Sequence, residues 1–176
     1  AGNFLIVAPT SAVDAETERF TSDLFNFIAP EGLATQLTNI GSVVDAAAFG
    51  AGDDYAFLLE GTAVENGENP QELEDSETIL ATFDPETASL TRLLVGSGYA
   101  AEHLTVSPDG THIAFAQMVV PMVEERDWFA LENWEVVVYN RESGEEMRIP
   151  NASNPHWTAD SERIAFLRSD GIYMQE

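Results

Sequence analysis

The sequence predicts an all-β protein made of β-propeller blades, each a sheet of four antiparallel strands. Two segments, 107–115 (SPDGTHIAF) and 158–166 (TADSERIAF), repeat a tight turn and an Ile-Ala-Phe strand at an offset of 51 residues. A second element, an apolar strand followed by a polar turn, recurs around them, and no strong amphipathic helix is evident. Repetition of a short strand-rich unit is typical of propellers.

The turn before each Ile-Ala-Phe strand has the residues that hairpins need. Pro108 presets φ at the second turn position, and Gly110 takes a positive φ without steric cost. The second copy has Ser161 in place of this glycine, so we expect its turn to be somewhat strained or differently shaped. A weaker copy at 50–57 (GAGDDYAF) ends in Tyr-Ala-Phe.

The strand after each turn is apolar on both faces. Ile113 and Phe115 point to one side and Ala114 to the other, because side chains alternate along a strand. Residues 164–166 repeat this arrangement. We therefore expect neighbouring blades to cover both sides of this strand, with large residues on one face nesting against small ones on the next.

The third and fourth strands of the unit follow from the second repeated element. Its apolar strands are Leu24–Ile28, Ile79–Phe83 and Val136–Tyr139, and the strands after their turns are Ala34–Thr38, Leu90–Leu94 and Glu146–Ile149. The unit recurs about every 51 to 58 residues when its insertions are included. A β-sandwich of hairpins is the alternative; it explains the strands but not their repetition.

This count predicts a single propeller-type domain over residues 1–176, with about three to four blades. The first blade contributes only its later strands, two blades are complete, and the last has three strands. A small four-bladed ring, an open partial ring and a piece of a longer chain all fit. An incomplete ring leaves sheet faces and edges uncovered, which favours binding of a partner.

At these residues the sequence resembles the TolB-type propeller repeat, in which an aromatic residue precedes Ser-Pro-Asp-Gly, a charged residue and Ile-Ala-Phe. Val106–Phe115 matches closely, with Val106 in place of the aromatic residue. Trp157–Phe166 keeps the aromatic residue but departs at Ala159 and Ser161. The resemblance covers about residues 24–176 and implies blades around a central channel. It does not specify a function, because such propellers serve many roles.

The composition restricts the partners of the chain. It has 31 acidic and 7 basic residues and a net charge of −24, which disfavours nucleic acid and anionic lipid. It contains no cysteine and no continuous apolar stretch long enough to span a membrane. The start at Ala1 fits removal of a signal peptide or a trimmed chain, and we expect a periplasmic or extracellular protein.

The sequence shows no catalytic motif, so it predicts a protein that is not an enzyme and needs no cofactor or metal. Gly96-Ser97-Gly98 is not a nucleophile elbow, and the three histidines lack the spacing of a metal pair. The acidic insertion at 63–77 lacks the pattern of a calcium loop and is interpreted as solvated. A glycosidase-type enzyme domain is the third-ranked alternative.

Aligning the repeats places Asp45, His103 and Asn154 at equivalent positions near the starts of the innermost strands. These positions approach the mouth of the channel on one face. A polar ring there would bind a small ligand or calcium, which is the second hypothesis, a sensor propeller. The alternative is ordinary capping of loops.

The insertion at 118–134 is the best candidate for an interaction site. It is rich in aromatic and aliphatic residues, and the candidates are Val119, Met122, Trp128, Phe129 and Trp134. Such residues in a projecting loop are typical of a contact surface; the alternative is that the loop folds back onto its own blades. The leading hypothesis is therefore a non-catalytic scaffold that binds other proteins, as an accessory subunit of a larger extracytoplasmic or membrane-associated complex.

Overall fold

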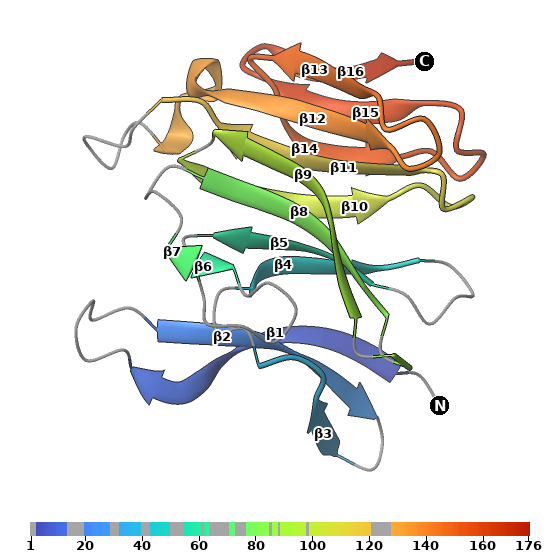
Figure 1. The fold of residues 1–176 in the computed structure, drawn as a ribbon. Coiled ribbons are helices and arrows are strands. Elements are labelled where there is room, and N and C mark those ends of the chain that lie inside the picture. Colours follow the sequence, from blue (N-terminus) through green and yellow to red (C-terminus); the bar gives the residue numbers. More distant parts are fainter. Residues whose placement is uncertain are drawn as a thin grey trace.

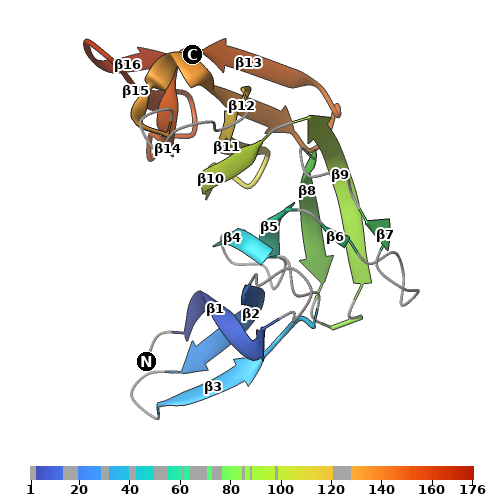
Figure 2. The same ribbon diagram turned by 90° about the vertical axis from the view of Figure 1, so that its left-hand side faces the viewer.

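The computed structural model describes residues 3–13, 20–28, 32–39, 43–49, 55–60, 62–63, 71–72, 77–84, 86–87, 89–97, 99–120 and 128–176. Within these ranges the strands form four antiparallel sheets and one small hairpin. The four sheets follow one another as blades along an arc that is not closed into a ring (Figures 1 and 2). In this part of the chain, no helix is long and apolar enough to cross a membrane.

The blades follow the chain order. The first blade contains β1 (Asn3–Val13), β2 (Phe20–Ile28) and β3 (Leu33–Gln36). The second contains β4 (Val43–Ala48), β5 (Tyr55–Glu60), β8 (Glu77–Asp84) and β9 (Ser89–Ser97). The third contains β10 (Ala100–Val106), β11 (His112–Met118), β12 (Trp134–Asn140) and β13 (Glu146–Pro150). The fourth contains β14 (Ser153–Trp157), β15 (Ile164–Arg168) and β16 (Gly171–Gln175).

Contacts between blades identify each strand's place in the repeat. The innermost strands β4, β10 and β14 lie side by side along the arc, and β11 and β12 lie against β14. In the same way, β1 and β2 lie against β4, so β1 is a second strand and β2 a third strand. The described part of the first blade therefore holds the second to fourth strands. The repeated patterns at 24–28 and 34–38 identified the last two of these.

The Ile-Ala-Phe strands lie between blades as expected. Ile113 and Phe115 of β11 are buried against Ala56 and Leu58 of the second blade. Ala114 faces the other way and packs with residues 164 and 166 of the fourth blade. The large side chains of one blade thus pack with the central alanine of the preceding blade, Ala56 or Ala114, and with its larger neighbours. This is the close packing that stabilises protein interiors.

The two repeated turns have the same shape. Gly110 has φ of +75° and Ser161 has φ of +63°, so the serine occupies the left-handed conformation that the glycine occupies in the first copy. Of the two outcomes expected for the second turn, strain is therefore the one found. A left-handed conformation costs a residue other than glycine about 1–2 kcal/mol.

Antiparallel order places the connections at two ends of the blades. At one end, the second strand leads to the third and each blade leads to the next; we call it the insertion face. It carries the hairpin of β6 (Thr62–Ala63) and β7 (Gln71–Glu72) and the short helix η1 (Leu131–Asn133). The opposite end, the turn face, carries the tight turns at 107–110, 140–145 and 158–161.

Candidate interaction surface

Each innermost strand has an irregularity at the same place, near the insertion face. The pairing register shifts between Val43 and Asp45 in β4, between 102 and 105 in β10, and between 153 and 156 in β14. In each case one extra residue is inserted, which is the geometry of a β-bulge. The candidate residues Asp45, His103 and Asn154 all lie at these bulges. The structure thus brings the three to equivalent places, as the repeat alignment predicted.

The carboxylate of Asp45 contacts the backbone of two blades. One oxygen accepts a hydrogen bond from the N–H of Ala46 at 2.8 Å, and the other accepts one from the N–H of Leu104 in the third blade at 2.7 Å. Buried N–H groups need acceptors, and Asp45 supplies them to one N–H of its own bulged strand and to one of the next innermost strand. It therefore joins the two strands. This corresponds to the capping alternative for this residue.

The other two bulge residues have a left-handed backbone, with φ of 59° at His103 and 52° at Asn154. The Nε2 atom of His103 lies 2.9 Å from the carboxylate of Glu102, and the His103 side chain is 45% exposed. Both residues are thus polar groups on the inner edge of the arc.

His112, the first residue of β11, is partly buried. Its Nε2 atom lies 3.0 Å from the side-chain nitrogen of Asn140 at the end of β12. Its ring lies 5.5 Å from the ring of Trp157 in the fourth blade. The sequence gives no sign of this contact, because it depends on the packing of two blades.

Two tryptophans hold the end of the 118–134 insertion. Trp134, the first residue of β12, is 1% exposed and belongs to a cluster with Ala100 and Met118. Its ring meets that of Trp128 edge to face at 5.1 Å, and its indole N–H donates to the Trp128 carbonyl at 2.9 Å. Trp134 is therefore a buried anchor of the segment, whereas Trp128 lies half-buried against it.

Phe129, the residue after Trp128, is 81% exposed. Val119 and Tyr99, which are 40% and 41% exposed, lie at the same end of the third blade. The Val119 N–H donates to the carbonyl of Asn133, and the Tyr99 N–H donates to that of Met118. The insertion face thus presents apolar side chains whose backbone is fixed by the blade. Met122, the remaining candidate, lies outside the described residues.

The acidic insertion at 63–77 lies largely outside the described residues. Within the ranges that the structure describes, no group of three or more His, Asp or Glu side chains is arranged to hold a metal ion. Asp84 ends β8 and accepts a hydrogen bond from the hydroxyl of Thr87 at 2.6 Å. This bond lowers the pKa of Asp84 and identifies the carboxylate as part of a turn.

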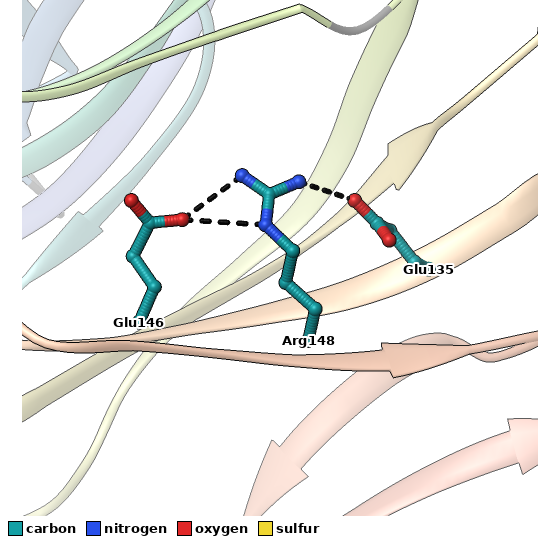
Figure 3. A network of polar contacts seen from close by, with 3 residues as sticks. All are labelled: Glu135, Glu146 and Arg148. Carbon is teal, nitrogen blue, oxygen red and sulfur yellow. Dashed lines mark hydrogen bonds and ion pairs between the residues drawn. The ribbon is translucent and has the colours of Figure 1, made fainter.

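Arg148, on the outer strand β13, lies between two glutamates (Figure 3). It donates to Glu146 at 2.9 Å and to Glu135 of the adjacent strand. Partial burial lowers the pKa of Arg148, but the hydrogen bonds to Glu146 and Glu135 outweigh it and raise the pKa above its ordinary value. In a chain of net charge −24, the single positive charge of Arg148 thus partly offsets two neighbouring negative charges.

The fold is similar to that of several solved propeller proteins. TolB from Acinetobacter baumannii aligns with 93% of this chain at 18% identity and a TM-score of 0.59. The acylaminoacyl peptidase of Pyrococcus horikoshii aligns with 99% at 12% identity and a TM-score of 0.59. An oligogalacturonate lyase in complex with manganese aligns with 86% at 13% identity and a TM-score of 0.54. The chain has a TolB-like propeller fold.

The chain spans 37%, 29% and 40% of these three proteins, respectively. No family model matches the sequence, and no curated protein matches it. Identities this low establish the fold and not the activity.

One expectation from the sequence is contradicted by these likenesses. The absence of a catalytic motif predicted a protein that is not an enzyme, yet a peptidase and a lyase are among the proteins with a similar fold. Function depends on the residues of a site and not on a fold or a single local motif, so a missing motif does not by itself exclude catalysis. The missing nucleophile elbow was therefore too narrow a criterion.

Proposed function

We propose that this chain is a propeller scaffold that binds another protein through its insertion face. The observation on which the proposal depends is Phe129, an aromatic side chain 81% exposed on a segment that the Trp128–Trp134 pair fixes in place. Aromatic side chains held in a rigid setting dominate binding energy at protein interfaces, since little conformational entropy is lost on binding.

The chemistry of the partner follows from the charge around Phe129. Glu132 is exposed in the same segment, Glu102 lies on the adjacent innermost strand, and the whole chain has a net charge of −24. A partner with an apolar pocket and a basic rim fits this surface, because complementary charge speeds association and disfavours wrong partners. We propose an accessory subunit of a larger extracytoplasmic or membrane-associated assembly.

The bulge residues His103 and Asn154 remain proposed contacts for a ligand at the inner edge of the arc. Asp45 is a weaker candidate, because both of its oxygens already accept backbone hydrogen bonds. Calorimetric titration with calcium separates the two functions. A sensor binds calcium saturably and loses that binding in Asn154→Ala, whereas the proposed scaffold needs no calcium.

A photo-crosslinking experiment tests the proposed surface. A photoreactive phenylalanine analogue replaces Phe129 in one variant and Glu142, exposed on the turn face, in a matched control. Irradiation in an extract of the native source should join one protein to position 129 and not to position 142. The purified partner should then bind the unmodified chain. Equal labelling at both positions, or a crosslinked protein that does not bind when purified, would refute the proposal.

A further inference from the structure

The last described sheet of the arc has an apolar face that no other described strand covers. In β15, Ile164 and Phe166 pack on the third blade, so Ala165 and Leu167 point to the opposite side. These two residues pair across the sheet with Met174 and Ile172 of β16. Ile172 is 78% and Met174 58% exposed. We call this set the trailing face; its residues are Ala165, Leu167, Ile172 and Met174.

The same positions in the third blade are buried at a contact between blades. Ala114 and Ala116 of β11 pair with Val138 and Val136 of β12, as residues 165 and 167 pair with 174 and 172. Val136 is fully buried and Val138 is 5% exposed, and both pack with the Ile-Ala-Phe residues of the fourth blade. The trailing face therefore has the pattern that receives the next blade.

The first sheet has the complementary face. Val7 faces the second blade, so the neighbouring Ile6 faces away from it; Ile6 is 39% exposed and pairs with Phe25. Phe27 points to the same side as Phe25, and Ala34 of β3 pairs with Phe27. We call this set the leading face; its residues are Ile6, Phe25, Phe27 and Ala34.

The repeat shows what such a leading face meets. Counting back from the ends of β2 and β12, residues 25 and 27 correspond to Val137 and Tyr139, and Ile6 corresponds to Phe115. Val137, Tyr139 and Phe115 are at most 8% exposed and pack on the preceding blade. The two end sheets thus have the patterns of the two halves of one blade-to-blade contact, and they lie at opposite ends of the arc in Figure 2.

We propose that the trailing face of one copy of this chain binds the leading face of a second copy. The chain itself supplies both halves of the contact, and each is built on the pattern that its internal blades use. Such a contact is head to tail, so the two faces are different surfaces of the same molecule. The eight residues of the two faces are uncharged, while each copy has a net charge of −24. The copies therefore repel at long range, and added salt should strengthen the association.

Light scattering on the purified 176-residue chain tests this proposal at protein concentrations near 100 µM. At high salt, the wild-type chain should have a mass at least twice that of one chain. Ile172→Glu, on the exposed trailing face, should be monomeric, as should Ile6→Glu on the leading face. Ala34→Glu is a second leading-face variant at an exposed position, used if Ile6→Glu does not fold by circular dichroism.

Mixing the variants makes the test specific. An equal mixture of Ile172→Glu with a leading-face variant retains one intact contact, so it should form dimers although each variant alone is monomeric. Phe129→Glu, on the proposed protein-binding surface, should associate like the wild type, which separates this inference from the proposed function. A monomeric wild type at high salt, an Ile172→Glu variant that still associates, or a mixture that stays monomeric would overturn the proposal.

Discussion

The backbone N–H of Asp109 donates a 3.0 Å hydrogen bond to the side-chain oxygen of Ser161, which joins the turn of the third blade to the equivalent turn of the fourth. Each of these turns also has an internal bond, from Ser107 to Asp109 in one and from Thr158 to Asp160 in the other. The repeat therefore conserves its turn geometry and uses it to connect neighbouring blades. Polar contacts at the turn face thus add to the apolar packing between sheets.

Substitution of Ser161 separates this bond from backbone strain. Ser161→Ala removes the acceptor and keeps a side chain in the left-handed conformation, so we expect a loss of about 0.5–1.5 kcal/mol in the free energy of unfolding. Ser161→Gly removes the same bond but relieves the strain, and should be about 1 kcal/mol more stable than Ser161→Ala. Urea unfolding measures both. Equal stability of the two variants would contradict the strain found at this turn.

Truncation of two phenylalanines of the third blade should change the free energy of unfolding by very different amounts. Phe115 is 1% exposed between the second and third blades, so Phe115→Ala should lower the free energy of unfolding by about 3–5 kcal/mol. Phe129 is 81% exposed, so Phe129→Ala should change it by less than about 0.5 kcal/mol. Denaturant unfolding of the two variants provides the comparison. A large destabilisation by Phe129→Ala would show that this residue stabilises the fold and is not simply presented for binding.

The stability contributed by Asp109 should depend on pH. The hydroxyl of Ser107 and the N–H of Thr111 donate to its carboxylate and lower its pKa. A folded-state pKa below the unfolded value of about 3.9 gives stability that is present above that value and lost as pH falls through the folded pKa. The difference in unfolding free energy between wild type and Asp109→Asn should therefore shrink as pH falls from 7 toward 3. A difference that stays constant over this range would contradict the prediction.

Comparing wild type with Asp109→Asn at each pH cancels the effect of acid on the charge repulsion within the chain. Protonation of many carboxylates also reduces the self-repulsion of a chain with a net charge of −24, but it does so in both proteins. Asp160→Asn is a useful repeat of the experiment, since the Thr158 hydroxyl lowers the pKa of Asp160 in the equivalent turn.

Asp45 should stabilise the junction of the second and third blades locally. Asp45→Ala leaves the N–H of Leu104 without its 2.7 Å acceptor, which should cost about 1–3 kcal/mol of unfolding free energy. Native-state hydrogen exchange should show the Leu104 amide exchanging faster, while amides of the fourth blade change less. Asp45→Asn keeps an acceptor oxygen and should lie between wild type and Asp45→Ala. An unchanged rate at Leu104 would show that this bond does not protect it.

Local chemistry explains why the fold could be predicted. The Ile-Ala-Phe segments alternate large and small residues with the period of a strand, and their turns place Gly110 or Ser161 where φ is positive. These features act over a few residues and repeat, so the sequence alone predicts four-stranded blades. The strand at 3–13 lacks the repeated turn, so its place in the first blade is known only from its pairing with β2.

The contacts of the candidate site were harder to predict, because they join residues far apart in the sequence. The equivalence of Asp45, His103 and Asn154 followed from the repeat, but the bond from Leu104 to Asp45 depends on how two bulges meet. The sequence grouped Trp134 with Phe129 as candidates for an interaction site, yet one is 1% and the other 81% exposed. Hydrophobic composition does not show which aromatic residue of a loop is buried and which is presented.

Calorimetric titration of this chain with its purified partner, the protein that crosslinks to position 129, tests the proposed scaffold most directly. Wild type and Phe129→Ala are compared, with Glu142→Ala on the turn face as the matched control. Loss of an aromatic anchor should weaken the affinity at least tenfold, or about 1.4 kcal/mol, while the control binds like the wild type. Equal affinity of wild type and Phe129→Ala would contradict the account.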